Sequence, residues 1–500
     1  MKKKWIKRVL IIALSLVIII TASVVIFKRN FDKVVNEAAR ACNTYSIDAE
    51  YDDEKKEITA YQKVLVKNIY GNKTDSLYFH LYPRAFREGA SVKPYTSLNQ
   101  GKCFSNGESF GNLDISYLAV DGEEKNVIYA GEDENVVQVE CKFNGKEKAV
   151  VEFKYKVILP NCNHRFGYAD DNVNICNWYP VLAHFDGEDF DISPYYSTGD
   201  PFCFDVSNFV INFTFPKEYA FASSGNIISK ATGEKTNIKI DAKAIRDCAI
   251  VLSKKFIETK VSLKNTNIYY YSYDGDEDNL YIVNLAKKAM EFFNSKFGEY
   301  PYRQISIVKS PFLYGGMEYS NLVVIADNIV EREDKARVIV HELAHQWWYG
   351  VVGNNQIKDA WVDESITEYS SFLFFENHPE FGISYGELLE DAKNTYELYV
   401  DVITSLGGSV NYKMTDAVDK YASEYEYSYM IYVKGVIMYD DLRAVIGDKK
   451  FYKSLQYYFK ANRFKIANNE DIIKAFEKKS NKNVKNVFNK YLYDNIKIKK

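Results

Sequence analysis

The residues best suited to chemistry lie together in the second half of the chain, where the segment His341-Glu342-Leu343-Ala344-His345 has helical apolar spacing around it. Side chains four residues apart share one face of a helix, so His341 and His345 can direct both imidazoles at one metal ion. Glu342 would stand beside a metal-bound water as a general base. With only six His in the chain, this pattern is expected by chance about 0.01 times. The segment therefore predicts a zinc site that hydrolyses its substrate.

A hydrolytic zinc ion needs a third protein ligand and one open position. Residues 353–355 indicate a turn that ends the first helix, and residues 361–369 predict a second helix. If that helix folds back antiparallel, Glu364 reaches the same metal. Glu368 lies one turn further on the same face, where it either accepts the N–H of a ligand imidazole or faces solvent. Asp363 is expected to be structural only.

The spacing of His341-Glu342-x-x-His345, 18 residues and then Glu364 resembles the gluzincin zinc metallopeptidases. More specifically, it resembles the aminopeptidase N and leukotriene hydrolase-type family. Four further segments resemble motifs of that family: Gly315-Gly316-Met317-Glu318-Tyr319, Tyr432-Val433-Lys434-Gly435, Asn177-Trp178-Tyr179-Pro180 and Arg246-Asp247-Cys248-Ala249. The resemblance covers roughly residues 58–495 and implies one bound Zn²⁺.

The resemblance also implies a role for each matched residue. Glu342 would be the catalytic base, and the Tyr432 hydroxyl would stabilise the oxyanion. Glu318 would bind the free α-amine of a peptide, and a second amine-binding residue is expected from residues 164–177. The predicted substrate-binding segment comprises Gly315, Gly316, Met317 and Glu318. Its glycines would let the backbone run beside an extended peptide.

Three functions remain open at this stage. The first is a zinc aminopeptidase that removes N-terminal residues from peptides. The second is an endopeptidase or peptide-trimming enzyme that uses the same zinc chemistry without a strict amine anchor; Tyr319, where the family usually has Asn, bears on this choice. The third is an inactive surface protein that binds peptides. One branch of the family also hydrolyses epoxides, and no motif here calls for that reaction.

The elements that must position these residues fall into two domains. Residues 58–257 alternate apolar and polar side chains in short runs broken by turn residues, which predicts an antiparallel, sandwich-like all-β domain. Residues 258–500 begin with strands and continue with helical spacing, which predicts an α+β domain. The resemblance implies a thermolysin-like zinc peptidase fold for this second part. It also implies that the long C-terminal helical domain of many family members is missing.

The N-terminal segment predicts a membrane anchor. Residues 9–27 form 19 consecutive uncharged and mostly apolar residues, about the length of one bilayer crossing. The basic residues that precede them predict a cytoplasmic tail over residues 1–8, with both domains outside the cell. A cleaved signal peptide is the alternative. Residues 28–57 are polar and charged, and we expect them to be a spacer.

Composition excludes other classes of function. The net charge is −4, so no broad basic surface is available for nucleic acid. The seven Cys all lie in the first half of the chain, away from the predicted catalytic residues, which excludes thiol catalysis. The expected partners are therefore peptide substrates and, through the N-terminal helix, a membrane.

Overall fold

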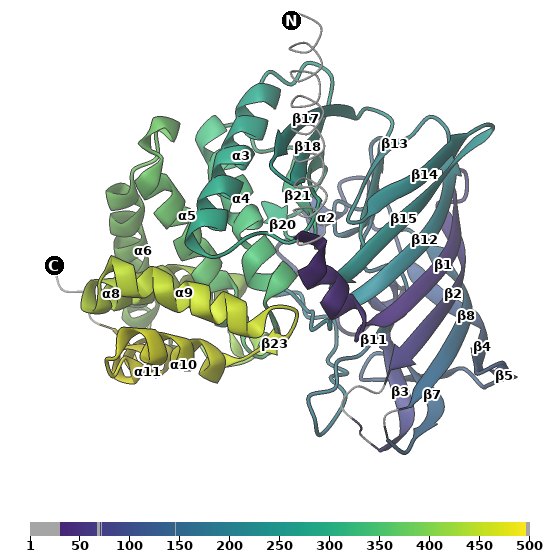
Figure 1. The fold of residues 1–500 in the computed structure, drawn as a ribbon, viewed down its shortest axis with the longest axis horizontal. Helices are drawn as coiled ribbons and strands as arrows, with labels where there is room; N and C mark the ends of the chain where they lie inside the picture. The colour runs from purple at the N-terminus through teal and green to yellow at the C-terminus, as the bar shows by residue number, and fades with distance from the viewer. Residues whose placement is uncertain (1–30, 68–70, 72, 146, 497–500) are drawn as a thin grey trace, which may run out of the picture.

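The structure is a computed structural model that describes residues 31–67, 71, 73–145 and 147–496. Within these residues a β-sheet domain and an α+β domain lie side by side (Figure 1). The two predicted domain types are therefore present in the predicted order. The predicted membrane helix over residues 9–27 lies outside the described residues. Within the described ranges, no helix combines the length and apolar character that a membrane crossing requires.

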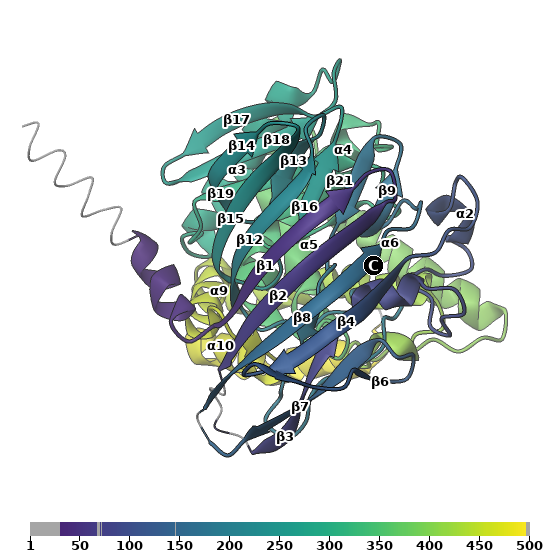
Figure 2. The ribbon, with the colours of Figure 1, turned by 90° about the vertical axis from the view of Figure 1, so that its right-hand side faces the viewer.

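The first domain is built on an eight-stranded sheet, whose strands cross the face seen in Figure 2. In spatial order they are β14 (Asn226–Thr232), β15 (Lys235–Ile245), β12 (Ser207–Pro216), β1 (Asn43–Asp52), β2 (Glu57–Lys67), β8 (Lys148–Ile158), β4 (Asn112–Val120) and β5 (Glu123–Glu124). Side chains at every second position of β12 are buried, as the alternating sequence predicts. One face of the sheet is therefore apolar and packs inward.

The first domain also contains two four-stranded sheets. One contains β13 (Ala220–Ser223), β16 (Ile250–Ser253), β10 (Asn172–Ile175) and β9 (Phe166–Ala169). The other contains β11 (Val181–Leu182), β3 (Thr74–His80), β7 (Val136–Phe143) and β6 (Ile128–Ala130). The rings of Phe79 in β3 and Phe153 in β8 meet with centroids 5.0 Å apart, so the sheets pack face to face as in a sandwich. Two short helical turns, η1 (Tyr82–Phe86) and α2 (Gln100–Cys103), lie in the loops.

The sequence prediction fails at the start of this domain. Residues 43–57, expected in a spacer, form β1 and the start of β2, and residues 31–39 are helical. β1 also pairs in parallel with β12, so the domain is not entirely antiparallel. The physical reason is burial, because β1 places Tyr45, Ile47 and Tyr51 in the core at 2%, 1% and 0% exposure.

The second domain begins with a five-stranded sheet. Its strands are β17 (Ile257–Leu263), β18 (Thr266–Ser272), β19 (Gln304–Ser310), β21 (Leu322–Ala326) and β20 (Gly316–Met317), in this spatial order. The helices are α3 (Asn279–Lys296), α4 (Arg332–Ala344), α5 (Glu364–Asn377), α6 (Tyr385–Ser405), α7 (Glu424–Ser428), α8 (Lys434–Ile446), α9 (Asp448–Asn462), α10 (Asn469–Ser480) and α11 (Lys485–Tyr493). Shorter elements are η2 (Gln346–Val351), η3 (Ala360–Val362), η4 (Pro379–Phe381), η5 (Val418–Lys420), η6 (Tyr429–Val433) and the pair β22 (Gly353–Asn354) and β23 (Ile466–Ala467).

Arg246 of the first domain joins it to the second. Its guanidinium donates to the main-chain carbonyls of Tyr349 at 2.5 Å, Val351 at 3.2 Å and Lys465 at 2.9 Å. A Cβ on Gly353 would collide with this guanidinium, so glycine is required there. Because a buried guanidinium satisfies several carbonyls at once, the segment that follows the first predicted helix is held against the β domain.

Candidate metal centre

The two predicted histidine ligands lie at the end of α4. The sequence predicts that the first helix continues towards the turn at residues 353–355, but α4 ends at Ala344 and a π-helical turn, η2, follows. The amide of Gly350 donates to the carbonyl of His345 at 2.9 Å, five residues back, which widens the chain there. His345 still donates its amide to the carbonyl of His341 at 3.2 Å. The two imidazoles therefore keep the helical spacing that sets them on one face.

Helix α5 packs against α4 and brings the third ligand. Glu364 is its first residue, and the side chain of Asp363 caps the helix by accepting the amide of Glu364 at 3.0 Å. Because the N-terminus of a helix favours an anion, both carboxylates suit this position. Glu364 is 3% exposed, so its carboxylate faces the protein interior and the two imidazoles. Burial opposes ionisation, but these imidazoles hold the pKa of Glu364 well below its usual value.

The three ligand atoms lie at, or slightly closer than, the spacing that tetrahedral zinc requires. Nε2 of His345 lies 3.1 Å from Nε2 of His341 and 3.1 Å from Oε2 of Glu364. Nε2 of His341 lies 3.4 Å from that carboxylate oxygen. Zinc–ligand bonds of about 2.0–2.2 Å in a tetrahedron place ligand atoms about 3.3–3.6 Å apart. Two histidines and one glutamate thus fit a zinc ion, with the fourth position left for water or substrate.

Hydrogen bonds on the far side of each imidazole fix its orientation. Nδ1 of His341 lies 2.6 Å from Oε2 of Glu368, the residue predicted as either an imidazole partner or a solvent-facing carboxylate. Nδ1 of His345 lies 3.2 Å from the carbonyl of Trp348 and 3.2 Å from Oγ1 of Thr367. A proton on each Nδ1 leaves the lone pair of Nε2 free for the metal. The arrangement is therefore ready to ligate without a change of tautomer.

Glu342 lies beside the ligands, under strand β20. It is 7% exposed, and its Oε2 has no hydrogen-bond partner within the described residues. A Cβ on Gly316 would collide with the Glu342 carboxylate, whereas one on Gly315 would make an ordinary 3.5 Å contact with Val338. Gly316 is thus required by Glu342 itself, in addition to the predicted contact with a peptide. Burial raises the pKa of Glu342 to about 8.

Tyr432 stands over the first ligand. Its ring stacks on that of His341 with centroids 5.8 Å apart and an interplanar angle of 24°. Burial and the Glu364 carboxylate raise the pKa of the phenol well above its usual value, so the hydroxyl keeps its proton. Nζ of Lys434 donates to the carbonyls of Tyr412 at 2.8 Å and Asp494 at 2.7 Å. These bonds hold the end of η6 in place.

Glu318 enters the site from the loop after β20. Its carboxylate forms a cluster with His345 and Asp363, in which one oxygen or ring nitrogen from each residue lies within 4.8 Å of the others. Oε1 of Glu318 accepts from Nε2 of Gln356 at 2.8 Å. Gln356 had no role in the sequence prediction, and Asp363, expected to be structural only, also accepts from that amide. The contact between Gln356 and Glu318 has no sequence signal, because the two residues are 38 positions apart.

Arg165 is a buried cation within the segment expected to supply a second amine-binding residue. Nε of Arg165 lies 3.1 Å from Sδ of Met317, and its Nη2 pairs with the carboxylate of Asp200. A guanidinium repels an ammonium, so Arg165 is not that residue. It instead balances part of the negative charge beside Glu318. Burial, together with Glu318, raises the pKa of Asp200 to about 7, although Arg165 acts to lower it.

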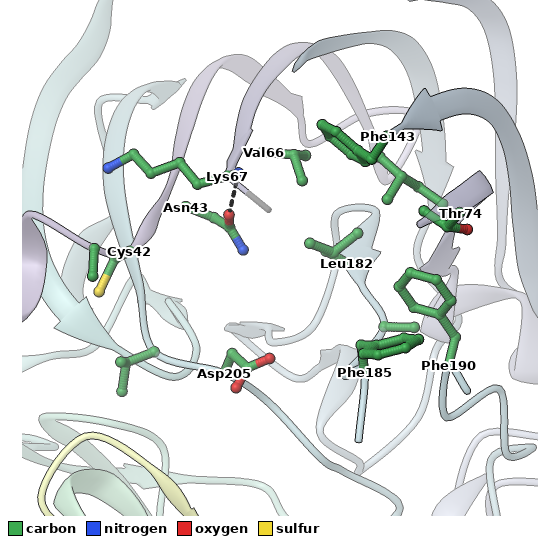
Figure 3. Close-up of a pocket in the computed structure, with 14 residues that line it drawn as sticks. Cys42, Asn43, Val66, Lys67, Thr74, Phe143, Leu182, Phe185, Phe190 and Asp205 are labelled. Carbon is green, nitrogen blue, oxygen red and sulfur yellow. Dashed lines mark hydrogen bonds between the residues drawn. The ribbon is translucent and has the colours of Figure 1, made fainter. Parts of the chain in front are cut away.

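A separate cavity lies within the β domain (Figure 3). Phe143, Phe185 and Phe190 line one side of it, and Cys42 and Asp205 lie on the other. Its volume is about 70 Å³, about half of what a cavity needs to hold benzene. Burial raises the pKa of the Cys42 thiol to about 11, so it is not a nucleophile. This small cavity therefore offers no reactive thiol.

Sequence comparison identifies relatives of the second domain. Residues 281–491 match the model of the peptidase family M1 domain. The chain is 27% identical over 216 residues to aminopeptidase N of Streptomyces lividans. This aligned region covers 41% of this chain and 25% of the relative. The chain is 25% identical over 251 residues to probable aminopeptidase 2 of Sulfurisphaera tokodaii, which covers 47% and 31%. The match thus spans about a quarter to a third of these relatives.

Solved structures extend the similarity to both domains. The M1 zinc metallopeptidase from Deinococcus radiodurans aligns with a TM-score of 0.63 at 12% identity, over 90% of this chain and 94% of that one. A variant of it bound to the tripeptide Tyr-Ser-Ala aligns with a TM-score of 0.64 at 12% identity, over 92% and 95%. At this identity the likeness concerns the fold, which is the two-domain fold of these enzymes. These findings agree with the resemblance found in the motifs: residues 281–491 match the peptidase family M1 domain, and His341, His345 and Glu364 within them form a candidate zinc site.

Proposed function

We propose that the protein is a zinc aminopeptidase that removes N-terminal residues from peptides. The position of Glu318 carries this proposal. A carboxylate oxygen that shares a 4.8 Å cluster with His345 and Asp363 can bind an ammonium group about one residue away from the metal. A peptide whose first residue occupies that space presents its first peptide bond, and no other, to the zinc.

The residues around the metal divide the reaction among them. Zinc, when bound, would polarise the scissile carbonyl and activate a water molecule. Glu342 takes the proton of the attacking water and passes it to the leaving amine. The protonated hydroxyl of Tyr432 donates to the oxygen of the tetrahedral carbon, where negative charge develops. Glu318 holds the α-amine, so the peptide cannot slide past the metal.

The relatives support this activity without extending it to a defined substrate. Both curated relatives described above are named aminopeptidases, and a variant of the Deinococcus radiodurans enzyme has been solved with the tripeptide Tyr-Ser-Ala. The endopeptidase alternative uses the same zinc ligands and the same base, but it gives Glu318 no part in choosing the peptide. The two activities therefore differ in their products.

Product analysis separates them. A decapeptide with a free N-terminus, incubated with the zinc-loaded protein, is expected to give a ladder of products that are shorter by one residue at a time from the N-terminus. Mass spectrometry reads this ladder directly. Internal fragments that form with equal yield from an N-acetylated decapeptide would identify an endopeptidase and refute the proposal.

We further propose that the enzyme acts on the outer face of a membrane, anchored by residues 9–27. The support is the sequence, which has 19 uncharged residues there and basic residues before them. Membrane fractionation, followed by protease treatment of intact cells, tests this proposal. The expected protein stays with membranes and is digested from outside. A protein released in soluble form without its first residues would instead identify a signal peptide.

A further inference from the structure

The carboxylate of Glu318 is held by one side-chain amide. Nε2 of Gln356 donates to Oε1 of Glu318 at 2.8 Å and to Oδ2 of Asp363 at 2.9 Å. Both bonds join N–H groups of the amide to carboxyl oxygens, so the N–H side of the amide faces Glu318 and Asp363. Turning the amide over would break both bonds and place its oxygen against the carboxyl oxygen of Glu318. Gln356 is 1% exposed, so no bulk solvent competes for these bonds.

The glutamine is only partly satisfied at this position. Oε1 of Gln356 is buried and has no hydrogen-bond partner within the described part of the chain. An apolar side chain would remove that unpartnered atom, but it would also leave buried oxygens of Glu318 and Asp363 without the N–H groups that they accept. The donors of the glutamine, rather than its oxygen, are therefore what the site uses.

The same amide connects Glu318 to the metal ligands. Asp363 receives one N–H of Gln356, and its other oxygen accepts the amide of Glu364 at 3.0 Å. Glu364 follows Asp363 directly in the chain and offers its carboxylate to the zinc. The path from Glu318 through Gln356 and Asp363 to Glu364 thus consists of two hydrogen bonds and one peptide bond. Its length sets the separation between the amine-binding carboxylate and the metal.

We propose that Gln356 is a positioning residue that fixes Glu318 relative to the zinc ligands and so sets the enzyme to cut after the first residue. The inference rests on the proposed aminopeptidase function. It assigns Gln356 no contact with the reacting atoms. Its effect passes through Glu318, so its removal acts on recognition of the free amine more than on the chemical step.

The test replaces Gln356 by Met, which keeps the length and removes the donors. KM for a free tripeptide is expected to rise about 10- to 100-fold, because that is the effect of losing a hydrogen bond to a charged group. The change in kcat is expected to be less than about threefold, because Gln356 does not contact the reacting atoms. The preference for the free over the N-acetylated tripeptide is expected to fall by the factor by which KM rises. Gln356→Leu is made alongside, and each variant is compared with the wild type in thermal unfolding and zinc content.

Asn355→Ala is the matched control. It removes an amide from the neighbouring position, where Asn355 binds Asp191 and the amides of Ile357 and Lys358 rather than Glu318. The backbone amide of Gln356, which donates to the carbonyl of Phe202 at 3.1 Å, stays in every variant. Asn355→Ala is expected to lower thermal stability and to leave the amine preference unchanged. If both variants lose the preference equally, loop structure is the cause and the inference is wrong.

A double-variant cycle separates an effect through Glu318 from an independent one. If Gln356 acts only through Glu318, then Glu318→Gln with Gln356→Met loses no more free-amine preference than Glu318→Gln alone. Losses that multiply contradict the inference. A folded Gln356→Met enzyme that prefers free amines as strongly as the wild type contradicts the role of Gln356 but leaves the aminopeptidase function intact. A wild-type enzyme that cleaves free and acetylated peptides equally refutes the aminopeptidase function itself.

Discussion

Oε2 of Glu368 lies 2.6 Å from Nδ1 of His341, on the opposite side of the imidazole from the nitrogen that faces the other metal ligands. This carboxylate orients the ring and makes its free nitrogen a better ligand. Glu368→Gln keeps an acceptor but removes the charge. The affinity for zinc is expected to fall about 10- to 100-fold, measured by titration against a competing chelator.

Glu376→Gln is the control for this variant. Glu376 lies on the same helix, α5, but pairs with Arg443 at 2.9 Å, away from the metal ligands. Its zinc affinity should equal that of the wild type. An unchanged affinity in Glu368→Gln would show that the 2.6 Å contact does not support the metal.

Glu342→Gln tests the general base. The substitution preserves size and leaves all three ligands in place, so zinc content is expected to stay the same. Because an amide cannot take a proton from water, kcat is expected to fall about 10²- to 10⁴-fold. Glu333→Gln, on an exposed position of the same helix, is the control. Turnover that survives Glu342→Gln with zinc bound would assign the base to another residue.

Much of the metal centre was predictable because it is local in sequence. His341 and His345 are one helical turn apart, so helix geometry alone brings them together. Glu364 follows after a short connection and needs only that the next helix folds back. The contacts around them are not local. Arg165 meets Met317 across 152 positions, and Gln356 meets Glu318 across 38. The first pair depends on how the two domains pack and the second on how the loops of the second domain meet, and no periodicity in a single sequence encodes either.

The fold was predictable to a similar extent. Alternating apolar and polar residues predicted the strands of the β domain, and helical spacing predicted the helices of the second domain. The error over residues 43–57 arose from the acidic and basic run near its end, which suggested a solvated spacer. That run is a turn between two core strands, whereas β1 alternates buried and exposed side chains from Tyr45 onward. The parallel pairing of β1 with β12 joins segments more than 150 residues apart, and local pattern cannot specify it.

Tyr432→Phe tests the oxyanion donor. The ring can keep its 5.8 Å stacking on His341 while the hydroxyl is lost. Because that hydroxyl donates only as negative charge develops, kcat is expected to fall about 10²- to 10³-fold with little change in KM. Tyr425→Phe is the control, since Tyr425 is 60% exposed. A KM effect without a kcat effect would make Tyr432 a substrate-binding residue instead.

A pair of glycine variants tests the contact between β20 and the base. A Cβ on Gly316 meets the carboxylate of Glu342, so Gly316→Ala must displace the base. A displacement of about 1 Å is expected to lower kcat about 100-fold. Gly315→Ala, whose Cβ meets Val338 at an ordinary 3.5 Å, should retain most activity. Equal kcat values in the two variants would contradict the proposed placement of Glu342.

The most direct test of a zinc-dependent aminopeptidase compares kcat/KM for one tripeptide with a free N-terminus and for its N-acetylated copy. The comparison is made with zinc bound, after chelation and after zinc is restored. We predict that the free peptide is cleaved at least about 100-fold faster, as the loss of a charge-assisted contact requires. We also predict that chelation abolishes this cleavage and that zinc restores it. Equal rates on the two peptides, or cleavage that persists without metal, would contradict the account.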